Sequence, residues 1–254
     1  VKIDGIEIAG AGPNAMDSPL SHALGNGHEI VLYQGIAPVS VGYETLAGAI
    51  EIKDVKPSLG DSKAFAAATT LSASWFTNND AKMVGVNTVL ANDKNYASFQ
   101  GQYQDAQNYE SGAGLIVPST FYERSGLKFK VGRQTDEYQL DLLVGTRNTN
   151  ESGTPALAMD ISFIDALWYK LSFEQNLSND WTTKVQVFGN QNQHIMNNFN
   201  LRTAPALAAY RQNTVDSKAV GVDLDIIQNS AKRDWQFGAN YYSQAHNSRI
   251  TNPN

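Results

Sequence analysis

Two methionines and one histidine are the residues of this chain whose types and spacing suit metal chemistry. His194 and Met196 form a His-x-Met pair, and Met16 lies far upstream in a glycine-rich segment. Thioether and imidazole groups are soft to borderline ligands that suit Cu(I) and bind Ca²⁺ or Mg²⁺ poorly. Met159 is a further sulfur candidate, for which packing is the simpler role. The alternative to metal binding is that Met16 also has only a packing role and that His194 is a hydrated loop residue.

Other chemistries have little support in the sequence. The chain has no cysteine, which excludes disulfides and thiolate metal sites. No nucleophile–base pair stands out, and the glycines of DGIEIAGAG precede no helix pattern that would receive a phosphate. The net charge of −6 argues against a nucleic-acid partner. We therefore expect neither an enzyme nor a prosthetic group.

The segments that must position these residues alternate apolar and polar side chains with period two. In the segment that starts at Trp181, the odd-numbered residues lie on one face, and Lys184 and Gln186 lie on the other. The same pattern predicts nine strands, at residues 63–76, 81–91, 95–107, 122–134, 137–149, 164–177, 181–197, 217–229 and 233–247.

Three features favour a bilayer-spanning barrel over a soluble β-sandwich, which would alternate in the same way. The predicted strands are about twice as long as soluble strands, which usually have about 5–6 residues. Tight turns alternate with long connections at residues 108–121, 150–163 and 198–216, as periplasmic turns and extracellular loops do. Aromatic residues cluster near strand ends, as interfacial girdles would: Trp75, Phe76, Trp168, Tyr169, Trp181, Trp235, Tyr241 and Tyr242.

The strand parity predicts where the metal-ligand candidates lie. If no bulge intervenes, His194 and Met196 share the even-numbered, lumenal face with Lys184 and Gln186. Their strand leaves a tight turn and runs outward, so both residues are expected near its extracellular end. Bacterial barrels have even strand numbers, and plugged transporters have about 22 strands. We therefore expect a truncated barrel, in a chain that starts at Val1 without a signal peptide.

The segment before the barrel pattern predicts a short strand that runs into a turn at residues 3–6. Two more short strands are predicted at residues 29–33 and 49–52, with glycine-rich loops between them. Residues 57–62, which include Pro57 and Gly60, are predicted to form a linker.

This front segment resembles the second half of the plug domain of TonB-dependent outer-membrane receptors. Such plugs show an IDG strand, then an IEVIRG-like strand, then a G…GGxInI segment. The matching residues here are Asp4 and Gly5, Gly35, Gly42 and Gly48, whereas Gln34 stands for the usual arginine and Ala47 for one glycine. The resemblance implies that residues 1–56 are the C-terminal half of a plug and that residues 63–254 are the first strands of its barrel.

Two segments resemble the copper-receptor branch of this family, namely residues 12–17 and residues 194–202. In those receptors a Cys-x-x-x-Met in the plug and a His-x-Met in the barrel converge on the metal. Met16, His194 and Met196 match this pattern, but Gly12 occupies the cysteine position, which removes the strongest ligand.

The resemblance implies active transport across the outer membrane of a Gram-negative bacterium. The TonB complex of the inner membrane would supply the energy, through an N-terminal part that this chain does not contain. Copper is the favoured cargo, and a siderophore or iron-chelate receptor of the same superfamily is the alternative. Asn14, Asn197, Asn198 and Arg202 either order their loops or contact a chelated ligand.

The competing functions make different predictions. Copper predicts that Met16, His194 and Met196 converge on one point, and a chelate predicts a wider pocket lined by aromatic residues and arginines. A passive porin would lack the plug segment. A soluble β-sandwich binding module predicts that its apolar faces meet in a core, whereas a barrel predicts an apolar band that faces outward.

Overall fold

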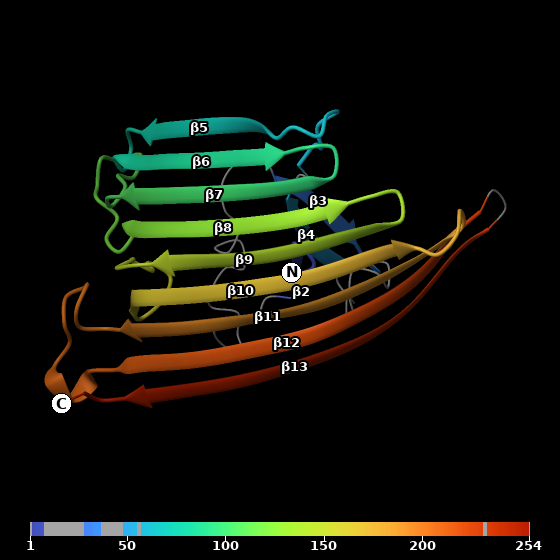
Figure 1. The fold of residues 1–254 in the computed structure, drawn as a ribbon. Coiled ribbons are helices and arrows are strands. Elements are labelled where there is room, and N and C mark those ends of the chain that lie inside the picture. The colour runs from blue at the N-terminus through green and yellow to red at the C-terminus, as the bar shows by residue number, and fades with distance from the viewer. Residues whose placement is uncertain (1, 8–27, 37–47, 55–56, 231–232, 254) are drawn as a thin grey trace.

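The chain forms two β-sheets, which Figure 1 shows one behind the other. A computed structural model describes residues 2–7, 28–36, 48–54, 57–230 and 233–253. A nine-stranded antiparallel sheet runs in sequence order from β5 to β13, and a four-stranded sheet has the order β2-β1-β4-β3. In the part of the chain that the structure describes, no helix has the length and apolar character needed to cross a membrane.

The nine strands of the large sheet are the nine that the alternation predicts. Each strand pairs antiparallel with its neighbours in the chain. Their bounds are β5 (Ala66–Phe76), β6 (Ala81–Ala91), β7 (Asn95–Ala106), β8 (Tyr122–Gln134), β9 (Tyr138–Thr149), β10 (Asp160–Asn176), β11 (Trp181–Asn197), β12 (Gln212–Asn229) and β13 (Asp234–Thr251).

Several predicted strand ends were wrong, mostly at the edge with the long loops. β10 begins at Asp160 instead of residue 164, β12 begins at Gln212 instead of residue 217, and β13 continues to Thr251. β5 begins at Ala66 instead of residue 63. The first three errors share one cause, because backbone pairing continues beyond the segment of each strand that the alternation delimits.

The connections alternate between the two edges of the large sheet, as predicted. The turns at residues 92–94, 135–137 and 177–180 lie at one edge, and the longer connections at residues 107–121, 150–159 and 198–211 lie at the other. The strands lengthen along the chain, from 11 residues in β5 to 18 residues in β13. β10–β13 therefore extend the sheet well beyond its first strands (Figure 1).

The small sheet contains the three predicted strands and one more. Its strands are β1 (Lys2–Ile3), β2 (Ile6–Glu7), β3 (His28–Gln34) and β4 (Gly48–Asp54). β4 pairs parallel with β1 and antiparallel with β3. The predicted strand that runs into a turn at residues 3–6 is confirmed, because Asp4 and Gly5 have φ of 52° and 78° and reverse the chain into the additional strand β2.

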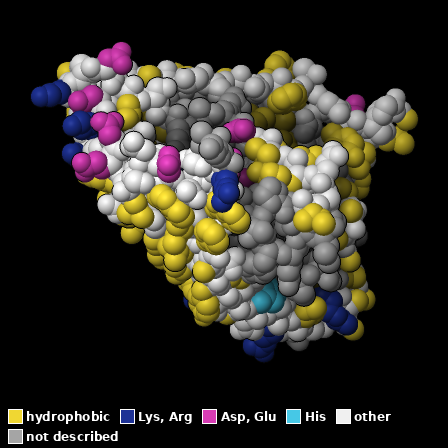
Figure 2. Space-filling view, turned by 90° about the vertical axis from the view of Figure 1, so that its right-hand side faces the viewer, with side chains coloured by type: hydrophobic (Ala, Val, Ile, Leu, Met, Phe, Trp, Pro, Cys, Tyr) yellow, Lys and Arg dark blue, Asp and Glu magenta, His cyan; other side chains and the backbone are white. Residues whose placement is uncertain are grey.

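The two faces of the large sheet have opposite character. On its outer face, Leu171 is 47% and Val187 45% exposed, and comparable apolar residues line the neighbouring strands. Figure 2, which views the molecule from the tight-turn edge, shows hydrophobic side chains gathered along one side. The inner face buries polar residues such as Lys128, Asp141 and Asn190. This arrangement is that of a barrel wall, with its apolar band outward, and it contradicts the soluble sandwich.

One part of the predicted aromatic girdle was wrong. Trp168 is only 1% exposed and lies on the inner face, and Tyr242 packs against the same inner cluster. Trp75, Trp235 and Tyr241 are exposed, as a girdle requires. Position near a strand end therefore does not identify a girdle residue, because adjacent residues of a strand point to opposite faces.

Candidate metal site and plug contact

The β1–β2 turn of the small sheet is seated on the inner face of the large sheet. The Asp4 carboxylate lies 3.4 Å from the Lys128 ammonium of β8, and both side chains are buried. The Lys170 ammonium of β10 donates a hydrogen bond to the Asp4 carbonyl oxygen. The Asp4 amide in turn donates to the Ile52 carbonyl oxygen of β4 at 2.7 Å. The turn is thus held both by its own sheet and by the barrel wall.

Ile6 completes this contact with an apolar anchor. Its side chain is fully buried in a cluster with four residues of the inner face: Leu143, Ala166, Trp168 and Phe188. The Trp168 ring lies directly over Gly145 of β9, where an added Cβ would collide with it. The IDG segment of the sequence therefore forms the contact between the small sheet and the inner face of the large sheet. Strand periodicity alone did not predict this contact.

His194 and Met196 occupy the predicted face of β11. Register with β12 is unbroken from Trp181 to Asn197, so no bulge changes the parity along this strand. His194 is 2% and Met196 1% exposed, both on the inner face and near the long-loop edge. The alternative in which His194 is a hydrated loop residue is wrong, because the strand pairing continues past it to Asn197.

Met159 and Met196 belong to one cluster. Met196 is buried with Ile161 and Ile164 of β10, and Met159 packs against this group from the preceding connection. A bulge in β10 between Ile161 and Phe163 turns Ile161 inward, where it pairs with Met196. Two thioethers thus lie in one cluster beside His194, which pairs with Ile164.

Arg202 fixes the loop that carries Met159. Its guanidinium donates to both carboxylate oxygens of Asp160, at 2.8 and 2.5 Å, and to the Leu157 and Thr154 carbonyl oxygens. Asp160 is 1% exposed and also accepts a hydrogen bond from the Thr154 amide. The hydrogen bond to Asp160 raises the pKa of Arg202. Arg202 therefore ties the connection after β11 to the connection before β10.

Asn197 and Asn198 order the same loop. The Asn197 side chain donates to the Ser162 hydroxyl at 2.8 Å and accepts from the amides of Phe199 and Asn200. Asn198 bonds to the backbone of Ala209 and Arg211, across the loop. Asn197, Asn198 and Arg202 were predicted either to order their loops or to contact a chelated ligand. Their hydrogen bonds support the first of these roles.

Several predicted site residues lie outside the described residues, namely Met16, Asn14 and Gly42, together with Gly12 at the cysteine position. Gly35 and Gly48 are described, with φ of 77° and 109°, in the left-handed region that favours glycine. Within the described ranges, no group of three or more His, Cys, Asp or Glu residues could hold a metal ion. A site here would therefore depend on thioether sulfur as well as imidazole.

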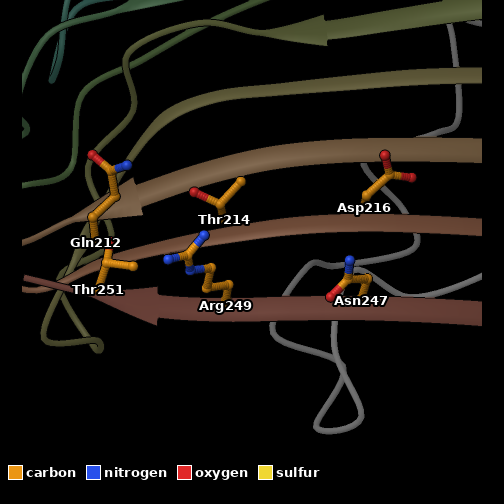
Figure 3. Close-up of a pocket in the computed structure, with 6 residues that line it drawn as sticks. All are labelled: Gln212, Thr214, Asp216, Asn247, Arg249 and Thr251. Carbon is orange, nitrogen blue, oxygen red and sulfur yellow. The ribbon is translucent and has the colours of Figure 1, made fainter.

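A polar pocket of about 420 Å³ lies on β12 and β13, near the long-loop edge. Its lining residues are Gln212, Thr214, Asp216, Asn247, Arg249 and Thr251 (Figure 3). Thr214 and Asp216 alternate with buried inner-face residues, so this pocket opens on the outer face. It lies on the opposite side of the sheet from His194.

The inner-face charges were only partly foreseen from the sequence. Strand parity assigns Lys128 and Lys184 to the lumenal face, but it gives no sign that Lys128 meets a carboxylate 124 residues away. Asp160 was missed because the predicted strand began after it. The sequence marks Asp160 only as an acidic residue directly before an apolar strand, which is a weak indication of a functional role.

Comparisons with family models and with curated proteins gave no match. Solved structures do match. The copper transporter OprC superposes with a TM-score of 0.85 and 24% identity, over 98% of this chain and 39% of that chain. The siderophore receptor PiuA from Acinetobacter baumannii gives a TM-score of 0.61 and 11% identity, over 88% of this chain and 37% of that one. FpvA of P. aeruginosa gives a TM-score of 0.62 and 12% identity, over 98% of this chain and 36% of that chain.

These similarities confirm the predicted fold, which is that of TonB-dependent receptors: part of a plug followed by the first strands of its barrel. The chain spans about two fifths of the length of the receptors that it matches.

Proposed function

We propose that this chain is the plug-and-barrel part of an outer-membrane receptor that imports a metal ion, with copper as the favoured cargo. We place the plug at residues 1–56, the linker at 57–62 and the barrel strands at 63–254. The TonB complex of the inner membrane would energise the receptor. Its outer band would contact lipid in the outer membrane of a Gram-negative bacterium.

The observation that carries this proposal is the position of His194 and Met196. Both side chains are buried on the inner face near the long-loop edge, which is where a solute from outside would first meet the lumen. The contact of the β1–β2 turn with the same inner face supports a gated passage. A passive porin would need no plug.

The donor set supports a soft monovalent ion. Imidazole and thioether groups favour Cu(I), and neither carries a charge when it binds. Met16 is proposed as the ligand from the plug, together with His194 and Met196. Met159 packs against the Met196 cluster and is the nearest further sulfur among the residues described. Without the cysteine that Gly12 replaces, we expect weaker and more readily reversible binding.

The test is metal titration of the full-length receptor that contains this chain. Cu(I) under reducing conditions and Ag(I), its redox-stable analogue, are titrated against the wild type and the variants Met16→Ala, His194→Ala and Met196→Leu. We expect at least a tenfold loss of affinity in each variant, since each removes one of few ligands.

Two matched controls separate ligation from general damage. His246→Ala removes a histidine of β13, and Met83→Leu removes a methionine of β6, and neither belongs to the Met196 cluster. We expect wild-type affinity in both. Equal affinity in the wild type and in all three ligand variants would refute the metal site, and a ferric chelate that binds where copper does not would favour the siderophore alternative.

A further inference from the structure

The polar pocket on the outer face of β12 and β13 adjoins the apolar band at its long-loop end. On β12 the outer-face residues change from Val222, which is 41% exposed, to Lys218 and Asp216 toward the long loops. On β13 the same change runs from Tyr241, which pairs with Val222, to Asn247, which pairs with Asp216. The pocket therefore lies where the apolar band ends, at the level of lipid headgroups. A neighbouring strand that pairs with β13 would use its edge and leave this outer face open.

Two cations flank the pocket. Arg249 lines it and pairs with Thr214 across the two strands, and Lys218 lies on β12 on the side of the apolar band. Among the residues that the structure describes, neither of these side chains makes an ion pair or a hydrogen bond. Lys82, an outer-face cation of β6 at the same edge, is instead paired with Asp80 at 2.9 Å. Positive charge that lacks an acidic partner is thus available on β12 and β13.

Most of the other lining residues carry uncharged hydrogen-bonding groups. They present amides and hydroxyls, from Gln212, Thr214, Asn247 and Thr251 (Figure 3). Asp216 is the exception, and its carboxylate accepts a hydrogen bond from the Gln193 amide at 3.2 Å. Groups of these kinds suit sugar hydroxyls, which both donate and accept hydrogen bonds. Two cations and one carboxylate also leave a net positive charge at the pocket.

The spacing of the two cations suits a single headgroup. Arg249 pairs with Thr214 and Lys218 pairs with Ala245, so the two lie four residues apart along the strand direction. This corresponds to about 14 Å between their backbones at about 3.4 Å per residue. Both side chains are long and flexible, so their charged ends can reach a ligand placed between them. The pocket volume of about 420 Å³ is within the range of small-molecule sites.

We propose that this pocket binds the headgroup of a phosphorylated glycolipid in the outer leaflet of the membrane. Arg249 and Lys218 bind its phosphate oxygens, and the amide and hydroxyl groups of the lining bind its sugar hydroxyls. The acyl chains lie along the apolar band, which begins at Val220 on β12. This inference rests on the proposed function, because it requires that the outer face of the sheet lies in the outer membrane.

The energetic argument has two parts. The Arg249 guanidinium can donate two parallel hydrogen bonds to phosphate oxygens, and the Lys218 ammonium adds a second positive charge. Both attractions are stronger beside the low-dielectric band than in bulk water. The acyl chains add apolar burial against Val220 and Val222, which a free phosphate ion cannot do. The site therefore favours a lipid over a soluble anion.

The experiment measures lipid binding to the full-length receptor in detergent by native mass spectrometry. The probes are lipid A, which is a phosphorylated glycolipid, its dephosphorylated form and phosphatidylglycerol, with inorganic phosphate as a competitor. The variants are Arg249→Gln and Lys218→Gln, at two exposed positions whose substitution leaves the inner face intact. Lys82→Gln is the matched control, because it removes an outer-face cation of the same edge that already has an acidic partner.

We expect lipid A to bind each of the two variants about tenfold more weakly than the wild type, because each loses one charge-assisted contact. Lys82→Gln should bind it as the wild type does. Dephosphorylated lipid A should bind the wild type and Arg249→Gln equally, since it offers the guanidinium no phosphate. Phosphatidylglycerol should bind the wild type more weakly than lipid A, since it has no sugar ring for the lining residues.

Unchanged lipid A affinity in Arg249→Gln and Lys218→Gln would overturn the site. An equal loss in Lys82→Gln would also overturn it, because binding would then follow overall charge and not this pocket. Phosphatidylglycerol that binds as tightly as lipid A would overturn the glycolipid, and inorganic phosphate that displaces lipid A at equal concentration would overturn the lipid. Metal titration of His194→Ala tests the proposed function separately, since His194 is buried on the opposite face of the sheet.

Discussion

Replacement of Asp4 by asparagine tests whether the buried ion pair holds the plug turn on the barrel wall. Asparagine has nearly the same shape as aspartate and tolerates positive φ, so it should keep the backbone angle of 52° at this position. The change removes the negative charge that lies 3.4 Å from the Lys128 ammonium. The hydrogen bond from Lys170 to the Asp4 carbonyl oxygen does not depend on the side chain.

The expected magnitude follows from burial and distance. The Lys128 and Asp4 side chains are 3% and 7% exposed, so water screens their attraction little. Removal of one partner of such a buried pair typically costs about 3–5 kcal/mol. The 3.4 Å separation exceeds the 2.7–2.9 Å of tight charge-assisted hydrogen bonds, so we expect about 2–3 kcal/mol.

Hydrogen exchange in the full-length receptor measures this cost directly. The Asp4 amide is protected by its bond to the Ile52 carbonyl oxygen of β4, and it exchanges when the turn opens away from β4. The buried ion pair opposes this opening because it fixes the Asp4 side chain against the barrel wall. A cost of about 2–3 kcal/mol corresponds to exchange roughly 30 to 150 times faster in Asp4→Asn. The control is Asp136→Asn in an exposed tight turn, which should leave the exchange of residues 2–7 unchanged.

A double-mutant cycle sharpens the test. Asp4→Asn combined with Lys128→Met removes both charges, so the double variant should exchange more slowly than Asp4→Asn alone. Exchange in Asp4→Asn within about twofold of the wild type would refute the ion pair as a holding contact. The turn would then be held by other contacts, among them Ile6, the hydrogen bond from Lys170 and the backbone bonds.

Three further changes test other parts of the structure. Gly145→Ala places a methyl group against the Trp168 ring and should cost about 1–3 kcal/mol in thermal unfolding, whereas Gly112→Ala, in open space, should be neutral. Arg202→Gln removes two hydrogen bonds from the buried Asp160 carboxylate, so limited proteolysis should cut the connection at residues 198–211 faster, and equal rates would contradict this role. Leu142→Arg puts a charge into the outer band and should cost about 2–4 kcal/mol in lipid, unlike the same change at loop residue Leu115.

The strand pattern was predictable because a sheet with one apolar face imposes period two on every strand. Lys184, Gln186, His194 and Met196 share one face of β11 as that period requires. Strand ends were less predictable, since a bulge between Ile161 and Phe163 interrupts the start of β10 and the first residues of β12, 212–216, are mostly polar. Trp168 was wrongly assigned to the aromatic girdle because only its distance from a strand end was considered. Its even-numbered position places it on the inner face, where it is buried.

The period-two pattern could not predict contacts between segments that lie far apart in the chain. The plug turn at Asp4 meets Lys128 and Lys170, and Arg202 meets Asp160, only after the sheet has curved and its loops have folded. The position of Arg249 relative to Lys218 needed the register of β12 and β13. Register depends on which backbone groups pair, and no single strand encodes that choice.

The amino-acid sequence by itself therefore determined the strand count, the faces of the strands, the plug motif and the candidate ligands His194 and Met196. These properties follow from local periodicity and residue type, which each segment carries independently of the rest. The tertiary structure alone decided the seat of the plug turn, the cluster of Met159 with Met196 and the outer-face pocket between Arg249 and Lys218. These depend on pairing and packing between segments that lie far apart in the chain.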